Sequence, residues 1–182
     1  MKKFFMMIAL LTIPFAMQAQ TKFHDVEANE AQGPVKSVTV TIKQQVTSVV
    51  VTTTVTFTPD GKIANSEGAT ISDAVYDENG YLLSCVTTAQ GSTAKVSYEW
   101  ENGRVKSQTS TKGDFVMKVT NCYDENGHII SAITEMGGNK SEMKISDYQF
   151  DDHGNWISRK QSMMGQENTF ISIIERSIEY YQ

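Results

Sequence analysis

Two stretches of the chain are nearly identical, and both carry side chains that could do chemistry. Tyr76–Leu82 reads YDENGYL and Tyr123–Ile129 reads YDENGHI. Each combines two carboxylates, an amide and a glycine, which suits a metal-binding loop or a catalytic turn. The repeat could therefore mark either a functional site or a structural unit.

Calcium is the first chemistry to consider, because carboxylate oxygens are the ligands that this ion prefers. Neighbouring hairpins of a flat sheet lie two strand spacings apart, roughly 10 Å. Calcium ligands must come within about 2.6 Å of one ion, so these turns cannot share one. We expect the carboxylates to cap their own turns by accepting local backbone N–H groups instead. The aspartates concerned are Asp60, Asp77, Asp124 and Asp151.

Histidine is the next candidate, because its imidazole serves as a metal ligand or a general base. The chain has His24, His128 and His153, and no two of them have the spacing of a metal-binding pair. No serine lies in a nucleophile elbow, and every glycine has a turn explanation, so a phosphate-binding loop is absent too. We therefore predict no catalytic, metal-binding or cofactor-binding residues, no cofactor and no enzymatic activity.

The two cysteines, Cys85 and Cys122, lie about three strands apart in the predicted sheet, roughly 14 Å. A disulfide needs Cα atoms within about 7 Å. We expect two free thiols unless the sheet rolls enough to bring them together. Cys122 precedes Tyr123, so the two side chains should lie on opposite faces of a strand, with Cys122 on the polar one.

The repeated stretch belongs to a set of five turns. In each turn an aromatic residue comes before the turn and an apolar residue follows its glycine, while the polar residues between them vary. A site would preserve the polar residues, whereas a hairpin preserves the flanking pair, which fixes its register. The predicted pairs are Phe57 with Ile63, Tyr76 with Leu82, Trp100 with Val105, Tyr123 with Ile129 and Phe150 with Trp156.

Two loop lengths preserve these pairs. Most of the turns read as three-residue loops, a type I turn followed by a left-handed glycine such as Gly80. Glu101–Arg104 is one residue shorter and reads as a two-residue Asn-Gly turn. A three-residue loop at Gln90–Ser92 would pair Val86 with Val96. Looser turns are expected at the other ends of the hairpins, near Gln44, Gly68, Gly91, Gly113, Gly137 and Gly165.

The fold class follows from alternation. Apolar and polar residues alternate with period two, as in Val38, Val40 and Ile42, which is typical of strands with one buried face. We predict an all-β protein, an antiparallel meander of about twelve strands in six hairpins between Val35 and Tyr181. Such a sheet must curl, close or fold over, so we expect a curved or rolled sheet, with a two-layer sandwich as the alternative. The outward positions are Thr, Ser, Lys, Glu and Gln, which argues against an outer-membrane barrel.

The N-terminus predicts export. Residues 1–19 form a short basic region and an apolar run, typical of a cleaved signal peptide and too short for a membrane span. The expected cleavage point has no cysteine, so we do not expect a lipid anchor. We expect a periplasmic or secreted protein. An extension at 20–32 and a single domain at 33–182 would follow. The net charge of −5 gives no reason to expect nucleic acid.

The turns resemble those of known repeat families. Aromatic-Asp-x-x-Gly-x-apolar at hairpin intervals resembles the tyrosine-aspartate repeats of RHS-type proteins, and Trp100–Val105 looks like the shorter hairpin unit of MORN-like repeats. The signal-peptide end AMQAQ and the segment Gly33–Val38 make the whole chain similar to small secreted β-repeat proteins of Bacteroidetes, many of unknown function. The resemblance implies large curved β-sheets without catalytic residues in the repeats. It covers about residues 33–160.

Two functions remain open. The first is a non-catalytic exported binding or scaffold protein whose partner is a protein, a glycan or a small apolar ligand. It would act through its broad surface or through the free edges that its first and last strands are expected to offer. The second is a carrier that encloses an apolar small ligand in its curled sheet. A pocket lined by Trp100, Trp156, Phe115, Met117 and Ile133 would favour the carrier, and a core filled by them would favour the binding module.

Four methionines bear on the same choice. They cluster in the last third of the chain, where they could be flexible core filler or an adaptable apolar patch for a ligand. They are Met136, Met143, Met163 and Met164.

Overall fold

The computed structural model describes residues 22–44, 50–164 and 169–182. The predicted signal peptide and the expected turns after Gln44 and at Gly165 lie outside the described residues, as does the side chain of Met164. Among the described residues, no helix is long and apolar enough to cross a membrane.

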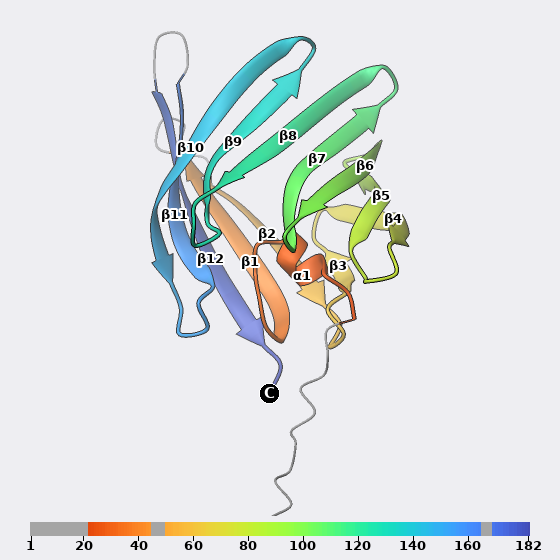
Figure 1. The fold of residues 1–182 in the computed structure, drawn as a ribbon, viewed down its shortest axis with the longest axis vertical. Coiled ribbons are helices and arrows are strands. Elements are labelled where there is room, and N and C mark those ends of the chain that lie inside the picture. The colour runs from red at the N-terminus through yellow and green to blue at the C-terminus, as the bar shows by residue number, and fades with distance from the viewer. Residues whose placement is uncertain (1–21, 45–49, 165–168) are drawn as a thin grey trace, which may run out of the picture.

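The described residues form one short helix and twelve antiparallel strands, and the order of the strands in the sheet is their order in the chain (Figure 1). The all-β meander predicted from alternation is therefore confirmed, and it rolls into a closed barrel rather than a sandwich. The elements are α1 (Asp25–Ala28), β1 (Val35–Gln44), β2 (Val50–Phe57), β3 (Ile63–Ser66), β4 (Ala69–Tyr76), β5 (Leu82–Ala89), β6 (Ser92–Glu101), β7 (Arg104–Lys112), β8 (Phe115–Tyr123), β9 (Ile129–Met136), β10 (Asn139–Phe150), β11 (Trp156–Met164) and β12 (Thr169–Tyr180).

The first and last strands close the barrel. β1 pairs with β12 from Val35 opposite Tyr180 to Gln44 opposite Ser172, with one bulge near the start. The expectation that these two strands offer free edges is therefore wrong. Closure satisfies their backbone N–H and C=O groups with each other, which removes the exposed edges of an open sheet.

All five predicted turn pairs are confirmed. Phe57, Tyr76, Trp100, Tyr123 and Phe150 each lie opposite the apolar residue that the turn pattern assigned to them. In all five hairpins a register shift, which marks a bulge, lies next to this pair on the side away from the turn, whichever length the turn has. The aromatic–apolar pair therefore sets the register of each hairpin.

One register prediction is wrong by one residue. Ala89 lies opposite Ser92, so Gln90 and Gly91 form a two-residue turn, and Val96 pairs with Cys85 rather than with Val86. Both turn residues have positive φ, +50° and +73°. This is the geometry of a type I′ turn, which matches the twist of the strands better than the three-residue loop does.

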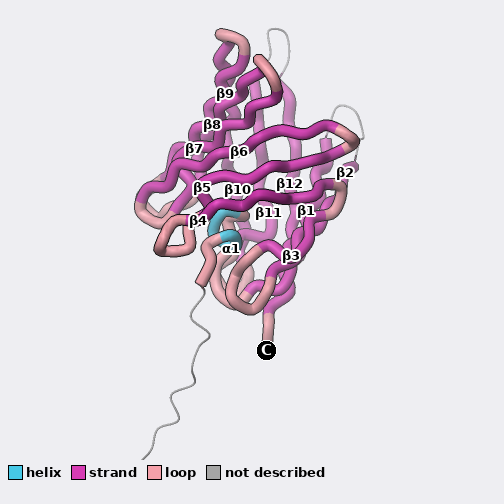
Figure 2. Tube along the Cα trace, turned by 90° about the vertical axis from the view of Figure 1, so that its right-hand side faces the viewer, coloured by secondary structure: helices cyan, strands magenta, loops and turns pink. Residues whose placement is uncertain are grey.

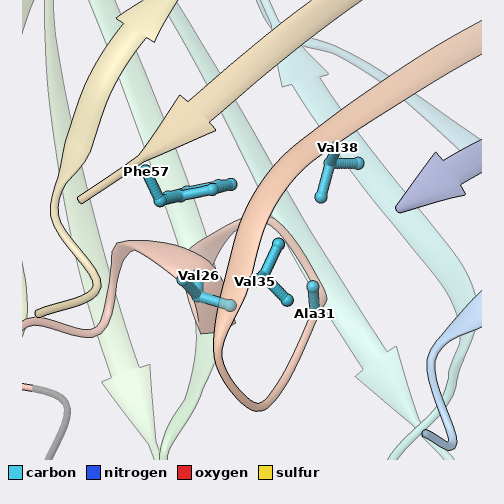
Figure 3. Close-up of a cluster of buried hydrophobic side chains, with 5 residues drawn as sticks. All are labelled: Val26, Ala31, Val35, Val38 and Phe57. Atoms are coloured by element: carbon cyan, nitrogen blue, oxygen red, sulfur yellow. The ribbon is translucent and has the colours of Figure 1, made fainter. Parts of the chain in front are cut away.

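The N-terminal segment closes one end of the barrel, here called the α1 end. The five aromatic-flanked turns lie at this end, together with the start of β1 and the end of β12 (Figures 1 and 2). Val26 of α1 and Ala31 after it pack with Val35, Val38 and Phe57 in a buried cluster (Figure 3). The residues expected to be an extension are thus part of the core.

The opposite end, here called the far end, carries the other set of turns. There the hairpins β7–β8 and β9–β10 project from the barrel in Figure 1. The described turns at this end lie at residues 67–68, 90–91, 113–114 and 137–138.

The wall of the barrel has one weak seam. β3 is four residues long and pairs with β4 only at Ser66 opposite Ala69. On its other side β3 pairs with just the last three residues of β2, from Val55 to Phe57. Beyond these pairs, the facing edges of β3 and β4 have no ladder partner among the described residues.

Candidate functional site

The aspartates cap their own turns. Asp77 Oδ1 accepts the N–H of Tyr81 at 2.8 Å, and Asp124 Oδ1 accepts the N–H of His128 at 2.8 Å. Asp151 Oδ1 accepts the N–H groups two and four residues later, both at 2.9 Å. The bond from His128 lowers the pKa of Asp124. At Asp151, burial raises the pKa, but the hydrogen bond from the Tyr180 hydroxyl together with the two backbone N–H groups outweighs burial and lowers it. The turn-capping prediction is confirmed at these three positions.

Asp60 is the exception. In its turn the capping position belongs to Thr58, whose Oγ1 accepts the N–H of Lys62 at 3.1 Å. The backbone carbonyl of Asp60 instead accepts the N–H groups of Lys22 and Phe23, both at 3.0 Å. This turn therefore docks the N-terminal segment. Among the described residues, no three His, Cys, Asp or Glu side chains are grouped so that they could hold a metal ion.

The three histidines lie apart, and each one packs against aromatic rings. His24 stacks on Tyr81 and His153 on Tyr180, with ring centroids 4.0 and 3.9 Å apart. His128 lies 4.7 Å from its nearest aromatic ring. Their surroundings are those of turn residues that cover the α1 end.

The cysteines occupy opposite faces of the wall. Both are free, and Cys85 is buried opposite Val96 on the inner face. Cys122 lies opposite Ser131, next to the inward-facing Tyr123, so it is on the outer face as expected.

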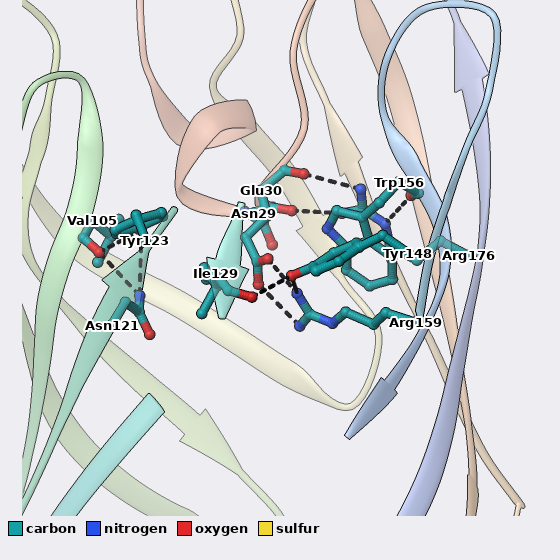
Figure 4. A network of polar contacts seen from close by, with 10 residues as sticks. All are labelled: Asn29, Glu30, Val105, Asn121, Tyr123, Ile129, Tyr148, Trp156, Arg159 and Arg176. Atoms are coloured by element: carbon teal, nitrogen blue, oxygen red, sulfur yellow. Dashed lines mark hydrogen bonds and ion pairs between the residues drawn. The ribbon is translucent and has the colours of Figure 1, made fainter. Parts of the chain in front are cut away.

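The most densely bonded polar site was not predicted from the sequence, and it lies inside the α1 end (Figure 4). The guanidinium of Arg176 donates to the backbone carbonyls of Trp156, Asn29 and Glu30, each at 2.9 Å. It reaches from β12 to the loop after α1. One buried side chain therefore joins the barrel wall to the N-terminal segment.

A second arginine holds the same loop. Arg159 of β11 forms a two-pronged ion pair with the carboxylate of Glu30, at 2.5 and 3.2 Å. The ring of Trp156 contacts both guanidiniums, whose carbons lie 4.0 Å (Arg159) and 3.5 Å (Arg176) from its centroid. Cation–π contacts strengthen when they are removed from water, as they are here.

The pKa values of the two arginines in this network are shifted in opposite directions. Burial lowers the pKa of Arg176 to about 10, and the nearby charge of Arg159 adds to this effect. Burial also disfavours the charge of Arg159, but Glu30 outweighs it and raises the pKa of Arg159. Glu30 is therefore the counter-ion on which two buried cations depend.

A cavity of about 280 Å³ lies between the loop after α1 and the turns of the α1 end. Tyr123 and Tyr148 line it, but their hydroxyls already donate to backbone carbonyls at 2.8 Å. Glu27 Oε2 and Trp156 Nε1 are buried without a partner among the described residues. The N-terminal segment before β1, residues 22–34, is therefore called the plug. The polar groups around it mostly bond to backbone carbonyls, and the cavity leaves space for small polar molecules.

The second site is apolar and lies on the inner face at the far end. Side chains that meet the α1 segment point into the barrel, so period two assigns the inner face along each strand. On β8 the inner face runs from Tyr123 through Met117 to Phe115, and on β12 from Arg176 to Phe170. Phe115 and Phe170 are nevertheless 52% and 51% exposed.

Methionines lie beside both phenylalanines on the inner face. Met117 lies opposite Met136, Met143 opposite Met163, and Met163 opposite Phe170. Met136 and Met163 are 43% and 39% exposed. We call these residues the inner apolar patch: Phe115, Met117, Met136, Met143, Met163 and Phe170.

The residues expected to line a pocket are not brought together. Trp100 is half-buried and donates from Nε1 to the carbonyl of Leu82 at 2.8 Å, while Trp156 is held between the arginines. Phe115 and Met117 lie on the inner apolar patch. Ile133 lies opposite Thr120 on the outer face, because a bulge in β9 changes which residues point inward. These five residues therefore form neither a single pocket nor a single filled core.

The sequence did contain a signal for the arginine network. Arg176 lies between Ile174 and Ile178 in the alternation of β12, at a position that otherwise holds apolar residues. An arginine in the buried register of a strand needs an internal partner. That signal points to a partner, although it does not say that Glu30 supplies it.

Comparison of the sequence with known proteins identifies no relative. No protein-family model matches the chain, and no curated protein matches it. The fold and its sites define the class: a twelve-stranded antiparallel barrel with one end occupied by the protein's own N-terminal segment.

Proposed function

We propose that this protein is a non-catalytic carrier that binds an apolar small ligand on the inner apolar patch. The observation that carries the proposal is that Phe115 and Phe170 face the barrel interior and yet remain half exposed. Large apolar side chains on an inner face are normally covered, and a ligand would cover them.

The composition of the patch supports an adaptable site. Methionine is unbranched and polarizable, so a methionine-rich surface can adjust to ligands of different shape. Covering apolar surface contributes roughly 25 cal/mol per Å². The barrel supplies the wall, and the plug at the α1 end leaves the far end as the side from which a ligand would enter.

The absence of catalysis is part of the proposal. At the α1 end, the arginines bind Glu30 and backbone carbonyls, and the tyrosine hydroxyls bind backbone carbonyls. Groups that are engaged in this way hold the plug and are poorly placed to transfer protons to a substrate. A broad binding or scaffold surface stays the second candidate, supported by the outward-facing Val75 and Val116, which are 52% and 49% exposed.

The cellular setting is also proposed from the sequence. The signal peptide at residues 1–19 would deliver the carrier to the periplasm or the cell exterior. The likeness of the turns to tyrosine-aspartate repeats supports only a structural role for these turns, since they set the hairpin register at one end of the barrel.

The test begins with native mass spectrometry on the chain without residues 1–19, exported by a bacterium and purified without detergent. Extra mass that is lost on denaturation would be the expected result. The same protein is then titrated with cis-parinaric acid, a fluorescent fatty acid. We expect Phe115→Ser to weaken binding at least tenfold.

The matched control is Val116→Ser. Val116 is the next residue of β8, similarly exposed but on the outer face. It should leave the affinity within about twofold, because it lies on the opposite face of β8 from the inner apolar patch. A bare monomer that does not bind the fatty acid, or equal losses in the two variants, would contradict the carrier.

A further inference from the structure

A second cavity lies in the wall of the barrel, at the seam between β3 and β4. The two strands share only the pair Ser66–Ala69, and beyond it a cavity of about 350 Å³ opens between them. Residues of both strands line this cavity, together with Asp25 of α1. It is separate from the inner apolar patch, none of whose residues line it.

Asp25 brings an incompletely bonded carboxylate to this cavity. The residue is only 1% exposed. Its Oδ2 accepts the N–H of Ile63 and the hydroxyl of Tyr76, both at 2.8 Å. Its Oδ1 is buried and has no hydrogen-bond partner among the described residues. A buried acceptor without a partner is costly, so a donor placed in the cavity would stabilise it.

The charged neighbours leave this oxygen free. Lys62 lies at the cavity, but its ammonium sits over the rings of Phe23 and Tyr76, 5.3 and 5.4 Å from their centroids. It forms no ion pair with Asp25 among the described residues. A second carboxylate, Asp73, lies at the rim, where its φ of +50° marks a bulge in β4. The cavity therefore has two carboxylates and one ammonium.

The rest of the wall is suited to a short hydrocarbon chain. Ile63, Ile71, Leu82 and Ala69 line the cavity with apolar side chains. A ligand that fits both features has an alkyl chain for this wall and a cationic donor at its end for Asp25 Oδ1.

We propose that the seam cavity binds an aliphatic cation, whose ammonium or guanidinium donates to Asp25 Oδ1 while its alkyl chain lies against Ile63, Ile71 and Leu82. Two sources share this chemistry. One is a free small amine. The other is a lysine or arginine side chain of an extended peptide, which would also use the unpaired edges of β3 and β4 for backbone hydrogen bonds.

Calorimetric titration of the chain without residues 1–19 tests the proposal. The probes are n-butylammonium, with n-butanol as its uncharged counterpart, and the blocked peptide acetyl-Thr-Lys-Thr-amide, with its norleucine analogue. We expect each cation to bind at least tenfold more tightly than its neutral counterpart. A peptide that binds at least tenfold more tightly than n-butylammonium identifies the peptide source, and equal affinities identify the free amine.

Two variants with the same change of charge locate the site. Asp25→Asn should weaken cation binding at least tenfold, while Asp73→Asn at the rim should change it no more than about threefold. If Asp25→Asn does not fold, wild-type amide resonances decide instead: n-butylammonium should shift those of Ile63 and Tyr76. Absence of binding, equal binding of n-butanol, or shifts confined to other strands would overturn the proposal and leave the inner apolar patch untouched.

Discussion

The two ends of the barrel are built from the same strands and differ in what fills them. At the α1 end, Phe57 is 2% exposed and packs against Val26 of the plug. At the far end, Phe115 is 52% exposed although it also faces inward. The difference shows that alternation decides which face a side chain takes, whereas a filling segment decides whether that face becomes core.

Stability should therefore be concentrated at the α1 end. Phe57→Ala creates a cavity in a packed cluster and should lower the free energy of unfolding by about 3–5 kcal/mol. Phe115→Ala removes a half-exposed ring and should lower it by less than about 1 kcal/mol. Urea denaturation of the two variants measures both values, and equal losses would show that the far end is packed as tightly.

The ion pair of the plug gives the next largest effect. Glu30→Ala leaves Arg159 buried without its carboxylate, and should lower the free energy of unfolding by about 3 kcal/mol. Glu175→Ala breaks the pair with Lys43, whose members are both about half exposed, and should change it by less than about 1 kcal/mol. A small loss in Glu30→Ala would mean that the plug is held mainly by Arg176. Thermal unfolding at matched ionic strength distinguishes these outcomes.

Glycines at the two ends of β5 sharpen the comparison. Gly80 has a φ of +87°, and a Cβ there would lie 1.9 Å from the carbonyl oxygen of Lys22. Gly91 has a φ of +73°, but a Cβ there would meet nothing within 4 Å. We expect Gly91→Ala to lower stability by about 1 kcal/mol, from backbone strain alone, and Gly80→Ala by at least about 2 kcal/mol. Equal values in denaturant titrations would show that the N-terminal segment moves aside easily.

The smallest effect is a dependence on pH at the turns. The hydrogen bond from the N–H of His128 holds the pKa of Asp124 below its ordinary value. A lowered pKa in the folded state contributes stability above the unfolded pKa, and that contribution disappears as the pH falls through the folded pKa. Asp124→Asn should therefore be less stable than wild type at about pH 6, with a difference that shrinks below about pH 4. Glu125→Gln, one residue away, removes the same charge and is the control for the change of charge itself.

The hairpins could be predicted because their determinants are local. The pairs of Tyr76 with Leu82 and Trp100 with Val105 depend on a few residues around one turn, and both are confirmed. The turn at Gln90 was misassigned because the sequence there allows two loop lengths, and a one-residue change shifts the register of the whole hairpin. The rolled sheet was predictable as well, since a wide one-sided meander must curl.

The sites depended on contacts that are distant in sequence. Glu30 meets Arg159 across 129 residues, and no periodicity in either segment connects them. Ile133 was assigned to the interior because the bulge in β9 was not recognised. The apolar character of the far end was visible in the methionines, but their exposure depends on what the plug leaves unfilled.

The closure of the barrel has a consequence for how fast the chain can reach this structure. Every pairing except one joins strands that are neighbours along the chain, and hairpins of this kind form within about 1–10 μs. The exception joins Val35 to Tyr180, so it must wait until the final strand is present and must close the largest loop in the molecule. We therefore expect the meeting of β1 and β12 to be the slow step of folding. Until that step, the chain is an open sheet with two unpaired edge strands, and this intermediate is the species most prone to aggregate by pairing with other copies.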